Sequence, residues 1–91
     1  MRITVIRTGG FGGLTRRATL DTAGRHDAAE VAALADRALR EGLSEAPMGV
    51  PDGFHYELSV EDGTRGTAHF ADPKLTEAQS SLVRKVLKEG A

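Results

Sequence analysis

Two histidines and one glutamate are the side chains best suited to chemistry. His55 and Glu57 lie on one face of an alternating segment, and His69 lies on the segment that returns after Gly63. A turn at Gly63 with a left-handed backbone places His55 directly opposite His69. Catalytic zinc usually takes three protein ligands, and only Glu57 could complete such a set. We therefore expect the two imidazoles to stand side by side in solvent without a structural metal.

Four glycines surround Phe11 in the segment between Gly9 and Gly13. A nucleotide-binding Gly-x-Gly-x-x-Gly motif that starts at Gly10 would need a glycine where the chain has Thr15, and no Walker pattern occurs. The segment either presents Phe11 on mobile backbone for a partner, or buries it while the glycines ease the turn. The sequence leaves both interpretations open.

Three arginines, Arg7, Arg16 and Arg17, form a small basic group beside the glycines. The chain has 12 Lys and Arg against 13 Asp and Glu, a net charge of −1, which excludes a protein that covers nucleic acid with positive charge. Aromatic residues that could stack on bases do not alternate with the arginines. A surface patch, or contact with an acidic protein, fits the group better than nucleic acid.

Catalytic motifs are missing from the sequence. No histidine-glutamate zinc motif, serine nucleophile elbow or convincing close pair of carboxylates can be found, and there is no cysteine. The lack of cysteine excludes disulfide scaffolds, thiol catalysis and cysteine-based zinc sites. We expect no enzyme activity and no cofactor.

The 91 residues are enough for one domain, residues 1–91. A domain of this size buries only about 60–65% of the surface of its unfolded chain, so a deep active-site cavity would compete with the core. No run approaches the ~20 apolar residues of a membrane span. The first residues lack the apolar stretch of a signal peptide. These features predict a cytoplasmic protein that has no membrane segment.

Hydrophobic periodicity predicts four strands and two helices. The first helix starts at Asp27, with Glu30 completing a capping box, and the second starts at a capping box formed by Thr76 and Gln79. Glycines end both helices. The predicted elements are strands 2–7, 14–21, 54–60 and 64–70, with helices between Asp27 and Gly42 and between Thr76 and Gly90.

This order predicts an α+β fold, a four-stranded antiparallel sheet with two helices on one face in the order ββαββα. The inward side chains of the last two strands should pack on apolar stripes of the helices. These core residues are Phe54, Tyr56, Leu58, Val60 and Phe70 from the sheet, and Val31, Leu34, Leu39, Leu82, Val83 and Val86 from the helices. The turn at Gly63 predicts the pairs Phe54 with Phe70, Tyr56 with Ala68, Leu58 with Gly66, and Val60 with Thr64.

Chain direction brings three irregular segments to one edge of the sheet: 9–13, 43–52 and 71–74. The second carries Pro47, Gly49 and Pro51, which disfavour regular structure. Loops on a rigid scaffold often carry binding residues. The candidate partner-binding residues are Gly9, Gly10, Phe11, Gly12, Gly13, Leu14, Arg16, Met48, Val50 and Asp52.

Two stretches, RTGGFGGLTRR at residues 7–17 and PDGFHYELSV at residues 51–60, resemble the signature stretches of the emfourin family. The resemblance spans nearly the whole chain, including its length and the Phe70-Ala71-Asp72 segment before the last helix. Emfourins are small bacterial inhibitors of protealysin-like metalloproteases, relatives of thermolysin. The resemblance implies an intracellular inhibitor, often encoded beside its protease. Thermolysin-like clefts favour a bulky apolar side chain just after the scissile bond, which Phe11 or Leu14 could supply.

The leading hypothesis is therefore a monomeric protein that inhibits a thermolysin-like metalloprotease by occluding its active-site cleft. The alternative is a general protein-interaction or regulatory module that uses the same edge on another partner. A small nucleic-acid binder that acts through Arg7, Arg16 and Arg17 is a third hypothesis, from a different class.

Overall fold

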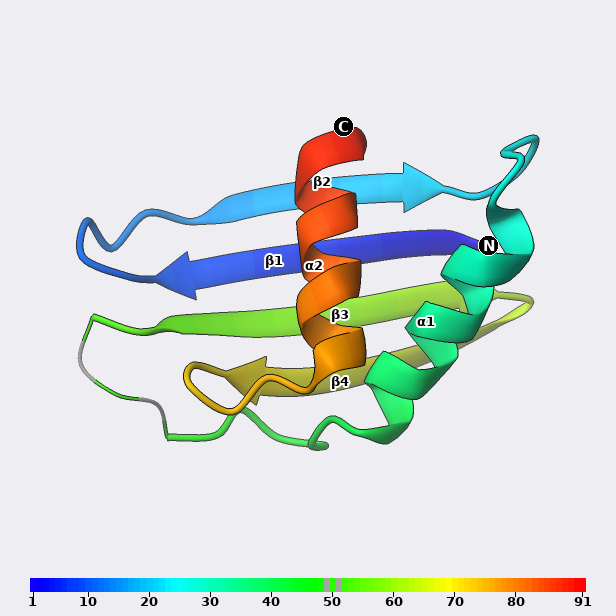
Figure 1. Ribbon diagram of the computed structural model, residues 1–91. Helices are drawn as coiled ribbons and strands as arrows, with labels where there is room; N and C mark the ends of the chain where they lie inside the picture. The colour runs from blue at the N-terminus through cyan, green and yellow to red at the C-terminus, as the bar shows by residue number, and fades with distance from the viewer. Residues whose placement is uncertain (49, 51) are drawn as a thin grey trace.

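The computed structural model describes residues 1–48, 50 and 52–91. Its elements are β1 (Arg2–Gly9), β2 (Arg16–Asp21), α1 (Ala28–Arg40), β3 (Phe54–Asp62), β4 (Thr64–Ala71) and α2 (Glu77–Glu89). The four strands form one antiparallel sheet in the order β2-β1-β3-β4. Both helices cover the same face of this sheet, and α2 lies across the strands (Figure 1). The predicted α+β fold is confirmed.

The core lies between the sheet and the two helices. Ile3 and Val5 of the central strand β1 are completely buried, because β-branched side chains suit a strand with neighbours on both sides. The predicted stripes are confirmed in most positions, while Phe54, Leu34 and Leu39 are only partly buried. The buried apolar residues of the predicted set are Tyr56, Leu58, Val60, Phe70, Val31, Leu82, Val83 and Val86.

The predicted register between β3 and β4 is wrong by two residues. Pairing continues to the end of both strands, so that only Gly63, with φ of 77°, stays at the tip instead of a three-residue turn. A shift of two residues keeps every side chain on its predicted face, because the side-chain period of a strand is two. The observed pairs include Tyr56 with Phe70, Leu58 with Ala68, Val60 with Gly66, and Asp62 with Thr64.

The same shift separates the two histidines. His55 lies opposite Ala71, and His69 lies opposite Glu57. The prediction that His55 and His69 are direct cross-strand neighbours is therefore wrong, although both stay on the face of the sheet away from the helices. No group of three or more His, Cys, Asp and Glu side chains among the described residues could hold a metal ion.

The two predicted capping boxes differ in outcome. At α2, the Gln79 N–H donates to Thr76 Oγ1 at 3.2 Å and the Thr76 N–H donates to Gln79 Oε1 at 3.0 Å, which confirms the box. Buried Gln79 also donates to the carbonyl of Ala38 at 3.2 Å, and so joins α2 to α1. At α1, the side chain of Asp27 makes no cap hydrogen bond.

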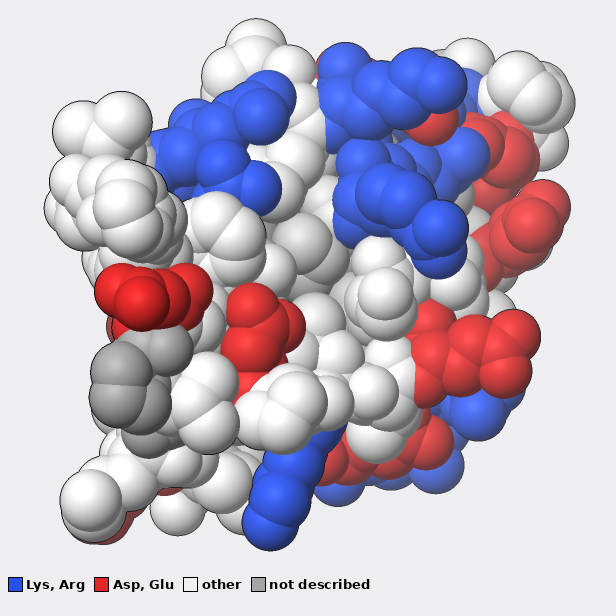
Figure 2. Space-filling view, turned by 60° about the vertical axis from the view of Figure 1, so that its left-hand side comes forward, with Lys and Arg blue, Asp and Glu red and all other residues white. Residues whose placement is uncertain are grey.

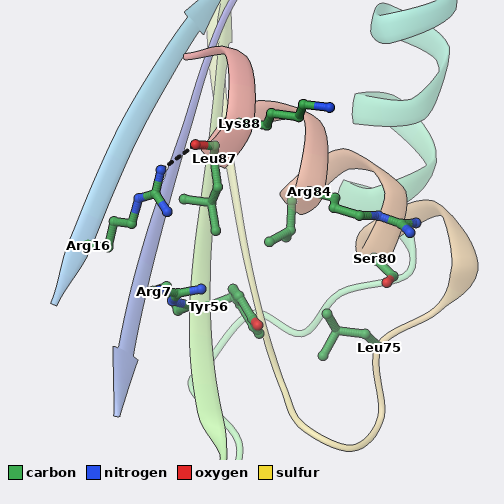
Figure 3. Close-up of a pocket in the computed structure, with 9 residues that line it drawn as sticks. Arg7, Arg16, Tyr56, Leu75, Ser80, Arg84, Leu87 and Lys88 are labelled. Carbon is green, nitrogen blue, oxygen red and sulfur yellow. Dashed lines mark hydrogen bonds between the residues drawn. The ribbon is translucent and has the colours of Figure 1, made fainter. Parts of the chain in front are cut away.

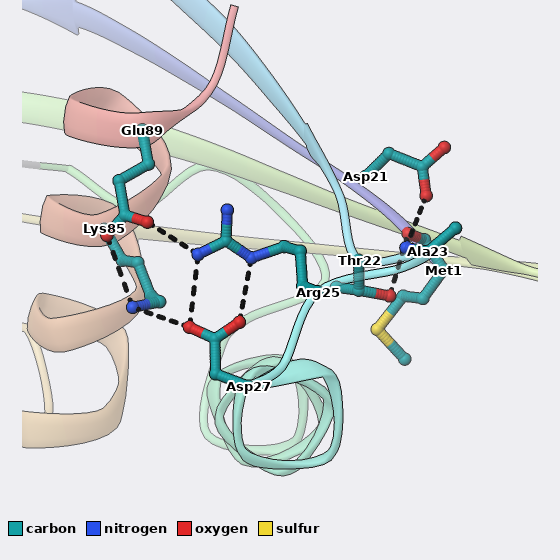
Figure 4. Close-up of polar contacts among 8 residues, drawn as sticks. All are labelled: Met1, Asp21, Thr22, Ala23, Arg25, Asp27, Lys85 and Glu89. Atoms are coloured by element: carbon teal, nitrogen blue, oxygen red, sulfur yellow. Dashed lines mark hydrogen bonds and ion pairs between the residues drawn. The ribbon is translucent and has the colours of Figure 1, made fainter.

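The carboxylate of Asp27 instead belongs to a four-residue ion cluster (Figure 4). Asp27 lies 2.8 Å from Arg25 Nε and 3.0 Å from Lys85 Nζ. Glu89 lies 2.6 Å from Arg25 Nη2 and 3.3 Å from Lys85 Nζ. Two cations therefore compete successfully for the carboxylate that the sequence assigns to a cap, and the cluster ties the start of α1 to the end of α2.

Single residues cover part of each outer strand. On the edge of β2, Thr19 and Ala91 exchange both backbone hydrogen bonds, at 3.0 and 2.9 Å. On the edge of β4, His69 and Leu43 do the same, at 2.8 and 2.9 Å.

Neither of the helices formed by the described residues has the length and apolar character needed to cross a lipid bilayer.

Leu58→Ala should lower the free energy of unfolding by about 2–5 kcal/mol, because it leaves a cavity beneath both helices. Leu58 is completely buried. Urea unfolding of the two proteins measures the difference. A loss below about 0.5 kcal/mol would contradict the placement of Leu58 in a rigid core.

Asp27→Asn should lower the melting temperature at pH 7, and the difference from wild type should shrink as the pH falls below about 4. Hydrogen bonds from Arg25, and then from Lys85, hold the pKa of Asp27 well below its usual range. A carboxylate with a lowered pKa stabilises the fold above its unfolded pKa, and this contribution is lost as acid protonates it. Melting curves from pH 7 to pH 2 test this.

The matched control is Asp36→Asn. Asp36 pairs with Arg40 at 2.9 Å, but both side chains are about two-thirds exposed, so solvent screens the pair. The control should melt like wild type at every pH. Equal behaviour of the two variants would show that the cluster around Asp27 contributes no more than a surface pair.

Candidate partner-binding site

Three loops meet at one end of the sheet, on the left of Figure 1. We call this end the loop edge; it comprises residues 10–15, the described part of residues 44–53, and residues 72–76. The Gly10 N–H donates to the Gly53 carbonyl at 3.1 Å. The Phe54 N–H donates to Asp72 Oδ2 at 3.0 Å, and the Asp72 N–H donates to the Phe54 carbonyl at 2.9 Å. Hydrogen bonds at the start of β3 thus join all three loops.

The sequence predicts that the middle loop lies at the loop edge from residue 43 onward, but Leu43 does not lie there. Its first residue, Leu43, pairs with His69 on the side of β4, because α1 ends at Arg40 and does not carry the chain to the loops. Gly49 and Pro51, which the sequence assigns to this loop, lie outside the described residues.

Phe11 stands in solvent at the tip of the first loop. Its side chain is 95% exposed, and that of Leu14 is 78% exposed. The interpretation of Phe11 as a core residue is therefore wrong, and the alternative, an apolar side chain presented on glycine-rich backbone, describes the structure. Phe11 and Leu14 together give this loop exposed apolar surface that a partner can cover.

The tip of this loop is exposed, whereas its base is held in place by backbone conformation and packing. Gly9 and Gly10 have φ of 89° and 75°, a region that other residues rarely adopt. Gly10 also lies against the ring of Phe54, where an added Cβ would come within 2.3 Å of Phe54 Cε1. Gly13 has φ of 65° but no neighbour within 4 Å. Glycine is thus required at the base by both backbone and packing.

Phe54 supports the loop from below. Its ring lies under the guanidinium of Arg7, 4.3 Å from the Arg7 Cζ atom to the ring centroid, and 6.3 Å from the ring centroid of Tyr56. Burial, together with the Asp72 carboxylate, raises the pKa of Tyr56, against a smaller opposite effect of Arg7. The alternating pattern of β3 marks Phe54 as a core residue, and only its contact with Gly10 reveals this role.

The middle loop adds a second apolar surface to the loop edge. Met48 is fully exposed, and Val50 and Leu43 are about half exposed. These residues line a cavity of about 420 Å³ together with Phe70 and Lys74. Asp52 is also exposed, and its φ of 64° is unusual for a residue other than glycine. The sequence does not indicate that Leu43 lines this cavity, because a leucine that follows a helix can equally well be buried in the core.

The three arginines do not form one group. The guanidinium of Arg16 donates to the carbonyl of Leu87 on α2 and so turns from the loop edge toward the helix. Arg7 lies on the same helix-covered side, whereas Arg17 lines a hollow on the opposite face with Arg2 and Arg65. Successive residues of a strand point to opposite faces, so Arg16 and Arg17 cannot act on one partner surface.

A protein-family model described as Emfourin matches residues 5–87. The matched range contains the whole loop edge and nearly all of both helices. No curated protein gives a significant match, and no solved structure does so either.

Gly10→Ala should destabilise the protein by about 1–3 kcal/mol, because the new Cβ meets the Phe54 ring and the backbone is strained. Gly13→Ala keeps the strain without the clash and should cost about 1 kcal/mol. Gly12 has neither a positive φ nor a close contact, so Gly12→Ala should be close to neutral. Chemical denaturation of the three variants checks this order, and equal stabilities would contradict the fixed loop base.

Proposed function

The chain belongs to the emfourin family, whose members are protease inhibitors, and on this premise we propose that it inhibits a thermolysin-like zinc metalloprotease of the protealysin type. It acts as a stoichiometric binder and contributes no catalytic group. The single observation that carries the proposal is the geometry of the glycine loop, an exposed Phe11 above a base held by Gly10 and Phe54.

Inhibition follows from occlusion of the active-site cleft. Phe11, or Leu14 beside it, enters the apolar subsite that follows the scissile bond. A single buried aromatic anchor often dominates the energy of an interface. Because the loop base is already ordered, less conformational entropy is lost on binding than for a free peptide. The flexible tip still permits the backbone to follow the floor of the cleft.

The middle loop covers the mouth of the cleft. Met48 and Val50 lie at the same end of the sheet as Phe11, and they offer exposed apolar surface to the wall of the protease. Arg16 stays outside this contact, since its guanidinium is held by Leu87. The proposed contact residues are Gly9, Gly10, Phe11, Gly12, Gly13, Leu14, Met48, Val50 and Asp52.

The proposal further describes a single-domain bacterial protein, residues 1–91, that works as a cytoplasmic monomer without a cofactor. The protein-interaction module remains the alternative, because another partner could use the same loop edge. The nucleic-acid hypothesis is less well supported, since Arg7 and Arg16 lie on one side of the sheet and Arg17 on the other.

Phe11→Ala should weaken inhibition by about 2 kcal/mol or more, roughly thirtyfold in affinity. The melting temperature should stay close to that of wild type, because the side chain touches almost nothing in the free protein. Titration of a purified protealysin-like enzyme, with hydrolysis of a peptide substrate as readout, measures the inhibition constants.

Arg65→Ala serves as the control, since Arg65 is exposed on the face away from the helices. This variant should inhibit like wild type. If Phe11→Ala inhibits normally, the contact lies elsewhere. If the wild-type protein inhibits no thermolysin-like enzyme, the protein-interaction module takes the place of the proposed function.

A further inference from the structure

A groove of about 500 Å³ lies between the sheet and α2, on the side of the helix that faces the loop edge (Figure 3). β1, β2 and β3 contribute one residue each, Leu75 comes from the loop before α2, and the helix contributes the rest. The lining residues are Arg7, Arg16, Tyr56, Leu75, Ser80, Val83, Arg84, Leu87 and Lys88.

Four of these residues are cations, Arg7, Arg16, Arg84 and Lys88, and none is a carboxylate. In the described part of the chain, no Asp or Glu oxygen lies within ion-pair distance of the four. Lys85, on the same helix, instead pairs with two carboxylates. The groove therefore gathers four cations that make no ion pair within the described part of the chain.

Three of the cations are arranged at a cost to the free protein. Arg84 and Lys88 stand four residues apart on α2, a spacing at which like charges repel. Arg7 Nε is buried and has no hydrogen-bond partner among the described residues. An anion between these groups would relieve the repulsion and add charge-assisted hydrogen bonds.

The floor of the groove is apolar and determines which kind of anion fits. Leu75, Val83 and Leu87 line it. In the upper half of Figure 2, basic side chains gather in two groups with uncharged ones between them, and acidic side chains lie on the same face. A long polyanion such as nucleic acid would meet these acidic groups. Within the groove its bases would find no open aromatic face among the described residues, because Tyr56 is buried and Arg7 covers Phe54 nearby.

We propose that this groove binds a short extended acidic segment of the protein that the loop edge contacts. Carboxylates of the segment lie between Arg16 on one side and Arg84 and Lys88 on the other, and an apolar side chain between them rests on Val83 and Leu87. That the partner is a protease rests on the proposed function. The preference of the groove for an acidic peptide is independent of the proposed function.

The first test uses a fluorescein-labelled ten-residue peptide of alternating Glu and Leu, titrated with the protein and followed by fluorescence anisotropy. Wild type should bind it, with an affinity that falls as salt is added. Arg84→Glu/Lys88→Glu should bind at least tenfold more weakly. The matched control, Arg2→Glu/Arg65→Glu, makes the same change in net charge on the opposite face and should bind like wild type.

Three results of this titration overturn the proposal. Wild type does not bind the peptide, or the groove variant and the control bind it equally well. In the third, a ten-nucleotide single-stranded DNA binds the groove more tightly than the peptide does, which would assign the groove to nucleic acid. Melting temperatures of both double variants close to that of wild type ensure that lost binding is not lost folding.

The second test measures inhibition of the protealysin-like enzyme by the same two double variants. The groove variant should associate at least tenfold more slowly than the control, because complementary charges accelerate encounter. If both variants inhibit equally while Phe11→Ala does not inhibit, the groove proposal fails and the proposed function stands. If wild type binds the peptide but inhibits no protease, the proposed function fails, and the acidic segment belongs to another partner.

Discussion

The packing of Gly10 against the ring of Phe54 is the contact on which the binding surfaces depend. The edge of the ring that carries Cδ1, Cε1 and Cζ lies against Gly10 of the first loop, and the guanidinium of Arg7 lies over the ring. The backbone of Phe54 is joined to Asp72 in the loop before α2. One side chain thus sets the position of the glycine loop and of Arg7, a cation of the groove between the sheet and α2, which we call the basic groove. A substitution of Phe54 should therefore alter both the loop edge and the basic groove.

The order of the elements could be predicted because period-two and helical patterns separate clearly in this chain. The register of β3 and β4 could not, since it depends on how many residues remain unpaired around Gly63, and both answers keep Tyr56 and Leu58 inside. The cap at Asp27 failed for a different reason. The Asp27 carboxylate pairs instead with Arg25 and Lys85, and Lys85, which is distant in sequence, comes close to it only in the folded chain.

The candidate site, too, could be predicted from the sequence only in part. Glycines around a phenylalanine indicate a loop, but the exposure of Phe11 at the tip is decided by how that loop folds. Chain direction predicts which end of the sheet the loops share. Alternation along the predicted strand 14–21 places Arg16 and Arg17 on opposite faces, but the hydrogen bond from Arg16 to Leu87 on α2 forms only in the folded chain.

Cations on α2 divide between two kinds of surroundings. Lys85 faces Asp27 and Glu89 and helps to hold the two helices together. Arg84 and Lys88 face the basic groove and find no such counter-ions in the described part of the chain. The same helix therefore uses one stripe of charge for its own fold and leaves the neighbouring stripe for an external anion.

The single-residue bridges at Leu43 and Ala91 have a consequence for how the protein behaves at high concentration. An outer strand with free amide and carbonyl groups is a template on which a second molecule can continue the sheet, and such growth leads to fibrils. Each bridge occupies two of these groups, at His69 of β4 and at Thr19 of β2. Stacking of copies edge to edge is blocked there, so contacts with other molecules are directed to side chains and loops.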